Sequence, residues 1–251
     1  MDMSGDPTFE LRELFGLKIS VLTRDAAVKF LENKICESVP VRLAFVNANL
    51  ANMAFEDKYL REMLCKFMLL NDGVGIDFAS RMLYGKHFPD NLNGTDFIPY
   101  FLDHCSVSLK VYLLGAKPTV IIRAADAFKK RWPRHKLVGF HDGYFSDADE
   151  EQIVEVIRAA NPQLLLIAMG NGLQERWVMR MTGGVSLSSW GVGALFDFLS
   201  GEVHRAPLWL RRLKVEWAYR LILEPRRMWQ RYVLGNPKFV LRVLIQRISR
   251  K

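Results

Sequence analysis

Leu69-Leu70-Asn71-Asp72-Gly73-Val74-Gly75 is the stretch of the chain that decides its fold. The apolar run 67–70 predicts a short buried strand, which ends directly in an acid and two glycines. In an α/β sheet, substrates bind at strand ends of this kind, because glycine lets the backbone approach a ligand and leaves the neighbouring side chain exposed. Asp72 is therefore a candidate catalytic residue. The alternative is that Asp72 only caps the helix that begins near Ile76.

Strand and helix patterns alternate on both sides of this stretch. Further strands are predicted at 17–22, 41–46, 110–114, 137–140, 164–169 and 185–190, with helical patterns between them. The run 164–169 is apolar throughout, as in strands that are buried on both faces of a parallel sheet. This alternation predicts an α/β fold with a Rossmann-like parallel sheet. Residues 1–15 are expected to form a loose leader, so the predicted core spans residues 16–204.

Polar residues and glycines follow several of the predicted strands. Asn47 and Asn49 follow the strand 41–46, where they could hydrogen-bond a sugar or a phosphate, although both are also ordinary turn residues. Gly115 lies at a strand-to-helix turn, the arrangement that offers helix amides to a phosphate. Gly170 and Gln174 follow the strand 164–169. These turns are the predicted nucleotide-binding elements.

The charge of the chain is concentrated in its last fifth. The net charge is +8, but thirteen Lys and Arg from Arg205 onward oppose only two acids, which gives the segment 205–251 a net charge of +11. Apolar residues recur there at helical spacing between the basic ones, with Trp and Tyr among them. Basic amphipathic helices of this kind suit an anionic membrane surface or diphosphate groups. Nucleic acid is the competing partner, but no nucleic-acid-binding motif is present. The segment could also pack against a second subunit, which would make a homo-oligomer.

Several other chemistries are not supported by the sequence. The three cysteines are scattered, so neither a disulfide framework nor a zinc site is predicted, and a reducing cytoplasm fits best. The sequence contains no G-x-S-x-G, H-E-x-x-H or Walker motif, and no uninterrupted apolar run of the roughly 18 residues that a membrane span needs. Asp147-Ala148-Asp149 has the D-x-D spacing of some metal sites, but it begins a polar helix, where acids complement the helix dipole. Neither a metal nor another cofactor is expected.

Seven ordered blocks of the chain resemble the WecG/TagA/CpsF family of glycosyltransferases, over roughly residues 17–235. The blocks are Asn71-Asp72-Gly73-Val74-Gly75, Asn93-Gly94-Thr95-Asp96, His141-Asp142-Gly143-Tyr144-Phe145, Gln174-Glu175-Arg176-Trp177, Val192-Gly193-Ala194-Leu195-Phe196-Asp197, Arg205-Ala206-Pro207 and the run 216–227. The resemblance implies a metal-independent, inverting transferase that moves a sugar from a UDP-sugar to a polyprenyl-diphosphate-linked sugar. It also implies a peripheral location at the cytoplasmic face of the membrane, in cell-surface or exopolysaccharide synthesis.

The resemblance also assigns roles to individual residues. Asp72 corresponds to the proposed general base, and Asn47 and Asn49 to residues that line the acceptor or donor pocket. Gln174 corresponds to a glutamine near the phosphates of the donor, and Asp197 to an acid in the nucleotide pocket. The resemblance implies that three arginines of the tail stabilise the diphosphate: Arg220, Arg227 and Arg231. The remaining predicted substrate-binding residues are Asn91, Gly94, Thr95 and Asp96.

Asn91 departs from the family pattern, which has an active-site arginine at this position. The loss of a cation favours a neutral hexose such as glucose over a charged or N-acetylated sugar. The predicted donor is glucose or an N-acetylmannosamine-type sugar. The same substitution makes an alternative conceivable. In that alternative, the chain is a membrane-associated assembly module that binds a sugar nucleotide and has lost catalytic activity.

Overall fold

The computed structural model of the protein describes residues 9–181, 187–203, 206–207, 210, 216–223 and 225–250. In this part of the chain, eight strands form one sheet in the order β1-β2-β4-β3-β8-β7-β5-β6, and all neighbouring pairs except β1 and β2 are parallel. The strands are β1 (Leu11–Leu14), β2 (Leu17–Ser20), β3 (Arg42–Val46), β4 (Met68–Asn71), β5 (Lys110–Gly115), β6 (Lys136–His141), β7 (Leu164–Ala168) and β8 (Ser188–Gly191). The predicted Rossmann-like α/β arrangement is confirmed.

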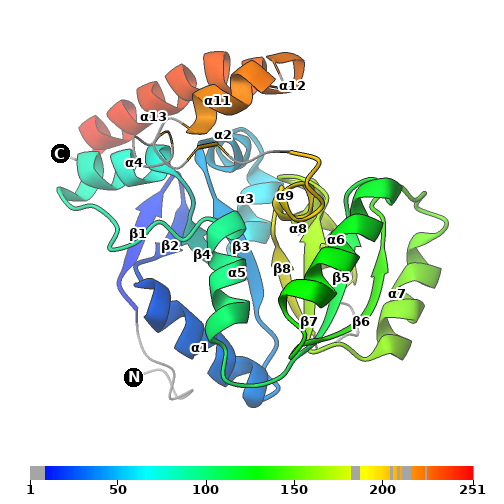
Figure 1. Ribbon diagram of the computed structural model, residues 1–251. Coiled ribbons are helices and arrows are strands. Elements are labelled where there is room, and N and C mark those ends of the chain that lie inside the picture. The colour runs from blue at the N-terminus through cyan, green and yellow to red at the C-terminus, as the bar shows by residue number, and fades with distance from the viewer. Residues whose placement is uncertain are drawn as a thin grey trace.

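Helices cover both faces of the sheet (Figure 1). The helices that pack on one face are α1 (Arg24–Cys36), α5 (Gly94–His104), α6 (Pro118–Arg131) and α9 (Leu195–Leu199). The helices on the other face are α2 (Ala48–Glu56), α3 (Lys58–Leu64), α4 (Val74–Tyr84), α7 (Glu150–Ala160) and α8 (Leu173–Met181). Successive side chains of a strand enter opposite faces, so Leu43 joins one hydrophobic cluster and Ala44 the other. The result is a three-layer core, buried on both sides of the sheet.

The prediction that residues 1–15 form a loose leader is wrong for the second half of that segment. Residues Leu11–Leu14 form β1, which pairs antiparallel with β2 and extends the sheet at its edge. Within this hairpin, Leu14 is buried, and Arg12 donates hydrogen bonds to Ser80 and to the backbone carbonyl of His87. The hairpin therefore belongs to the core, which begins earlier than residue 16.

The described C-terminal elements form a layer next to α2 and α4, as Figure 1 shows in orange and red. They are α11 (Glu216–Leu223), α12 (Pro225–Trp229), the π-helical turn η1 (Gln230–Leu234) and α13 (Gly235–Ser249). Phe239 and Val243 of α13 are fully buried in the same cluster as α2 and α4. Arg242 donates a hydrogen bond to Asn52 at 2.9 Å and pairs with Glu56. α13 is thus packed on the α/β core.

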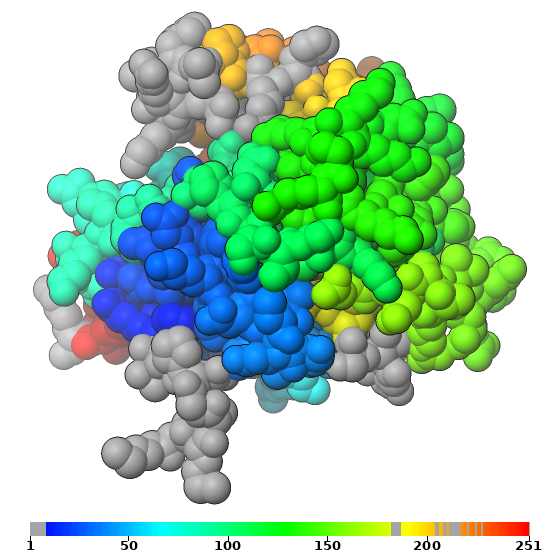
Figure 2. Space-filling view, turned by 60° about the horizontal axis from the view of Figure 1, so that its bottom comes forward, coloured from blue at the N-terminus to red at the C-terminus, as the bar shows by residue number. Residues whose placement is uncertain are grey.

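The end of α13 also reaches the N-terminal hairpin. Arg250 donates hydrogen bonds to the Glu13 carbonyl and the Tyr84 hydroxyl, both at 3.0 Å. In Figure 2 the red end of α13 accordingly lies beside the dark blue N-terminal strands. No helix in the described ranges combines the length and the apolar character that a membrane crossing requires.

Gly115, at the end of β5, lies very close to the backbone of the neighbouring strand β7. A substitution can test this close approach. Its φ angle is +123°, and a Cβ at this position would overlap the backbone carbonyl of Ala168 on β7. We expect Gly115→Ala to lower the free energy of unfolding by about 3 kcal/mol, from steric overlap and backbone strain together. Urea denaturation would measure this change.

Gly85 provides the matched control, because its φ angle of +71° is also positive but an added Cβ would meet nothing within 4 Å. Gly85→Ala should therefore cost only the backbone term, about 1–2 kcal/mol. Equal losses for the two variants would contradict the steric argument for Gly115.

Candidate active site

A cavity of about 1300 Å³ opens at the carboxyl edge of the sheet. Its walls come from the turns that follow β3, β4, β5, β7 and β8, from the loop before α5, and from the C-terminal layer. Trp217, Arg231, Tyr232 and Phe239 are the aromatic and basic contributions of that layer. Substrates of open α/β sheets bind at this edge, so the cavity is the candidate active site.

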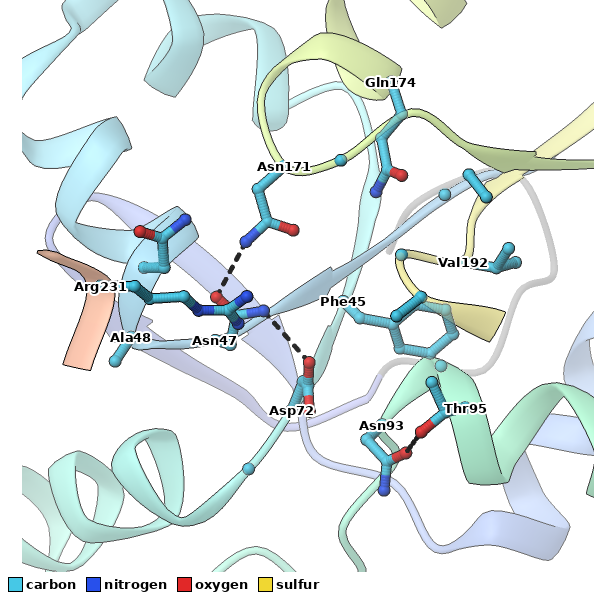
Figure 3. A pocket seen from close by; sticks show the side chains of 18 of the residues that line it. Phe45, Asn47, Ala48, Asp72, Asn93, Thr95, Asn171, Gln174, Val192 and Arg231 are labelled. Carbon is cyan, nitrogen blue, oxygen red and sulfur yellow. Dashed lines mark hydrogen bonds between the residues drawn. The ribbon is translucent and has the colours of Figure 1, made fainter. Parts of the chain in front are cut away.

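Asp72 lies in the cavity wall directly after β4. Its backbone amide donates to the Val46 carbonyl at 2.8 Å, which ties the turn to the end of β3. Its half-buried carboxylate accepts a hydrogen bond from Asn47 Nδ2 at 3.2 Å (Figure 3). The sequence left Asp72 as an alternative cap of the following helix, but the N-cap residue of that helix, α4, is Gly73.

Asn47 holds Asp72 within a network that joins three strand ends. Asn47 Oδ1 accepts from the Leu50 amide at 3.1 Å, which caps α2, and from Asn171 Nδ2 at 3.0 Å. Figure 3 shows the resulting chain from Asn171 through Asn47 to Asp72. Asn49 also lines the cavity, and its amide contacts the Met53 sulfur at 3.5 Å. The fixed amides orient one oxygen of the carboxylate and leave the group at the cavity surface.

The loop before α5 supports the Asp72 turn from the other side. Asn91 Oδ1 accepts from the Gly73 amide at 2.8 Å, and Asn71 Nδ2 donates to the Asp90 carbonyl at 2.9 Å. Asn71 is buried, lines the cavity and has a side-chain oxygen without a partner in the protein. The Asn91 side chain therefore holds the backbone of the turn that carries Asp72, and Asn91 also lines the cavity.

Gly94, Thr95 and Asp96 form the first turn of α5. Two of them line the cavity, and the third takes part in the cap of the helix. Gly94 and Thr95 line the cavity. Asp96 is not among the described lining residues; its carboxylate accepts from Asn93 Nδ2 at 2.9 Å, and the Asn93 side chain caps the helix by accepting from the Asp96 amide. The structure thus gives Asp96 a capping contact.

Gly115 is likewise not among the described lining residues, whereas the next two residues are. Ala116 and Lys117 line the cavity at the start of α6. Gly115 itself serves the close approach of β5 to β7 described above. A ligand at this turn would meet Lys117 and the first amides of α6 instead of the glycine.

Gly170 and Gln174 line the cavity after β7, as predicted from the strand exit. Gln174 is 3% exposed, and its Nε2 donates to Glu175 Oε1 at 2.8 Å. Glu175 is 1% exposed, and its other oxygen accepts from the Gly172 amide at 2.6 Å. Burial raises the pKa of Glu175, and these two hydrogen bonds oppose that rise. The buried side chain of Glu175 therefore stabilises this turn through two hydrogen bonds.

The predicted arginines of the tail differ in how far the structure describes them. Arg231 lies in η1, lines the cavity and extends into it in Figure 3. The backbones of Arg220 and Arg227 belong to α11 and α12, but their side chains lie outside the described residues. Asp197 lines the cavity from α9. Arg176 and Arg180 line it too, paired with Asp57 and Glu150 respectively.

Helix N-termini surround the cavity. The turns that begin α2, α4, α5, α6, α8 and α9 all contribute lining residues. Unpaired amides and the positive end of the helix dipole favour anions at such a place. Asp147 of the D-x-D stretch lines the cavity, whereas Asp149 accepts from the Ser146 hydroxyl and amide, which lowers its pKa. Within the described ranges, no three His, Cys, Asp or Glu side chains gather as metal ligands.

Asn171, Glu175 and Lys117 are among the contributors that the sequence did not single out as individual site residues. Asn171 lies in the same turn as Gly170, and its two flanking glycines were a signal that the turn approaches something closely. Lys117 directly follows the predicted Gly115 turn. Glu175 gave no signal, because an acid in the first turn of a helix is ordinary.

Comparison with known proteins identifies the family. The sequence model of the glycosyl transferase WecG/TagA/CpsF family matches residues 12–251. The chain belongs to this family of glycosyltransferases. A relative from Bacillus subtilis strain 168, an N-acetylglucosaminyldiphosphoundecaprenol N-acetyl-beta-D-mannosaminyltransferase, is 32% identical over 89% of this chain and 87% of its own length. A protein with the same name from Bacillus spizizenii strain W23 is 32% identical over 70% of this chain and 67% of its own length.

The glycosyltransferase family and the cavity agree in their chemical requirements. Glycosyl transfer to a hydroxyl group needs a base for the hydroxyl proton and positive charge or amide dipoles for the leaving group. Asp72 is a carboxylate at the cavity surface, and Arg231, Lys117 and the helix N-termini border the same space.

Proposed function

We propose that the protein transfers a sugar from a UDP-sugar to a sugar linked to polyprenyl diphosphate, in the synthesis of a cell-surface polymer. The observation that carries the proposal is the Asp72 carboxylate, held by Asn47 in a large cavity that helix N-termini and Arg231 also border. The names of both relatives support the acceptor class, because each acts on an N-acetylglucosaminyl group linked to diphosphoundecaprenol.

In the proposed reaction, Asp72 takes the proton of the acceptor hydroxyl as its oxygen attacks the sugar carbon from the side opposite UDP. The bond between the acceptor oxygen and the sugar carbon forms while the bond from that carbon to the UDP oxygen breaks. The configuration at the carbon is therefore inverted. Arg231 and the helix N-terminal amides stabilise the departing diphosphate without a metal. We propose that Arg220 and Arg227, whose side chains lie outside the described residues, join Arg231 in this role.

Two donor sugars fit different observations. The relatives' names support an N-acetylmannosamine-type sugar. A neutral hexose such as glucose fits Asn91, which supplies no charge and uses its side-chain oxygen on the Gly73 amide. A survey of donors would decide between them.

Incubation of the purified protein with UDP-glucose, UDP-N-acetylmannosamine and its uronate tests the function. The acceptor is a polyprenyl-diphosphate N-acetylglucosamine, and parallel reactions contain EDTA. Mass spectrometry should detect one added sugar on the lipid, in equal amounts with and without EDTA. Binding of UDP without transfer from any donor would instead favour the catalytically inactive assembly module.

We further propose that the C-terminal layer binds the cytoplasmic face of an anionic membrane, where the acceptor lies. The layer exposes apolar side chains beside basic ones, an arrangement that favours interfacial binding. The exposed apolar residues are Ile222, Leu223, Trp229, Val233, Leu234, Leu241, Ile245 and Ile248. The basic residues of α13 are Lys238, Arg242 and Arg247, and Arg250 directly follows the helix.

Ile245→Glu tests the membrane proposal. Ile245 is 55% exposed, so the variant should fold normally but lose about tenfold in affinity for vesicles that contain phosphatidylglycerol, measured by co-sedimentation. Ile122→Glu on α6 is the matched control, because Ile122 is 52% exposed and lies outside the C-terminal layer. Equal vesicle binding by both variants would contradict the proposal. A change of oligomeric state in size-exclusion chromatography for Ile245→Glu alone would assign the surface to a subunit contact instead.

A further inference from the structure

The Gln174 side chain lies in the cavity wall with its two amide atoms in different surroundings. Nε2 donates to Glu175 Oε1 at 2.8 Å, whereas Oε1 is buried and has no hydrogen-bond partner among the described residues. Figure 3 shows the amide group directed toward the middle of the cavity. A buried carbonyl oxygen without a partner is unfavourable, so an O–H or N–H group of a bound molecule would be held there.

Glu175 determines which end of this amide is available. Its two oxygens accept hydrogen bonds from the Gly172 amide and from Gln174 Nε2. If the Gln174 amide were rotated by half a turn, its oxygen would face a carboxylate oxygen, and two acceptors would repel each other. The orientation therefore follows from the use of both Glu175 oxygens as acceptors.

Gly191 at the end of β8 makes room for this arrangement. A Cβ at position 191 would lie 2.5 Å from Gln174 Nε2. The amide is thus enclosed by the β8 backbone on one side and by Glu175 on another, so it can exchange its oxygen and nitrogen by rotation but cannot move elsewhere without displacing its neighbours.

We propose that Glu175 is a positioning residue that presents the Gln174 carbonyl oxygen as a hydrogen-bond acceptor for an O–H or N–H group of the sugar nucleotide. This inference rests on the proposed function, because it concerns the donor substrate of the same cavity. A carbonyl oxygen repels phosphate oxygens, so Gln174 binds a hydroxyl of the sugar or the imide N–H of uracil. This proposal gives Gln174 no hydrogen bond to the diphosphate, although the family resemblance places the corresponding glutamine near the phosphates of the donor.

Glu175→Gln reverses the orientation while preserving the shape of the site. The oxygen of the new amide can still accept from the Gly172 amide, which leaves its NH₂ group facing Gln174. Gln174 must then turn its own oxygen toward that NH₂ and its NH₂ toward the cavity. The variant replaces an acceptor by a donor and should lose about tenfold or more in affinity for the UDP-sugar.

Isothermal titration calorimetry with the UDP-sugar and with UDP measures this loss. Glu175→Gln should weaken UDP-sugar binding in the wild-type background and have no further effect in a Gln174→Ala background, because Glu175 acts through Gln174. Its thermal midpoint should be close to that of the wild type, because glutamine keeps the shape of the side chain and can still accept from the Gly172 amide. Glu151→Gln, at an exposed position of α7, is the matched control and should bind like the wild type.

The two ligands distinguish the two sources of the hydrogen bond. Weaker binding of the UDP-sugar alone assigns the Gln174 oxygen to the sugar, and equal weakening of both ligands assigns it to uracil. A folded Glu175→Gln variant that binds both ligands as tightly as the wild type would overturn the inference and leave the proposed function intact. Wild-type protein that bound no UDP-sugar at all would overturn the proposed function and the inference with it.

Discussion

Asp72→Asn is expected to lower the rate of sugar transfer by about 10²–10⁴-fold, the range that general bases contribute to catalysis. An asparagine keeps the size of the side chain, and its oxygen can still accept the hydrogen bond from Asn47 Nδ2. It cannot take a proton from the acceptor hydroxyl. The loss should therefore appear in kcat, with little change in the affinity for the UDP-sugar, and steady-state kinetics with the lipid acceptor would measure both.

Asp126→Asn is the matched control for Asp72→Asn. Asp126 is an exposed acid on α6, outside the cavity lining, so this variant loses the same charge without touching the site. It should transfer sugar at the wild-type rate. Full activity of a correctly folded Asp72→Asn variant would remove the base assignment, and another group would then have to take the proton.

The sequence predicted those parts of the molecule that depend on local pattern. Apolar runs that end in glycine or in polar residues mark strand exits of a parallel sheet. This is why Asp72, Asn47 and Gln174 could be expected at one edge before their contacts were known. β1 was missed because it is only four residues long, with two buried positions, Arg12 and Leu14, in alternation.

The contacts that complete the site are not local, so a local pattern such as the glycines on either side of Asn171 does not say which residue is contacted. Asn171 reaches Asn47 across 124 positions of the chain, because β7 and β3 end beside the same neighbour, β8. Gly115 illustrates a different limit, because a local signal can also have a structural cause. The glycine is required by the Ala168 carbonyl of the adjacent strand, a constraint that depends on which strands pair.

The position of Arg231 gives the second large expectation, because the C-terminal layer places this cation in the wall of the cavity. Arg231 lies in a π-helical turn, a local irregularity that often occurs at functional sites, and it is partly buried in the cavity wall. The developing charge on a leaving diphosphate is greatest in the transition state, so a guanidinium there stabilises that state more than the bound substrate.

Arg231→Met should therefore lower kcat/KM for transfer by about 10²-fold, with most of the loss in kcat. Methionine keeps the apolar stem that packs in the cavity wall and removes only the charged end. Arg226→Met is the matched control, since Arg226 is an exposed arginine of α12 and its loss changes the net charge of the layer equally. If both variants lost activity to the same extent, the arginines would act through the overall charge of the layer at the membrane. A loss confined to Arg231→Met requires instead that the layer remain packed on α2 and α4 during transfer. The packing of Phe239 and Val243 and the hydrogen bonds of Asn52 to the layer hold η1 over the cavity.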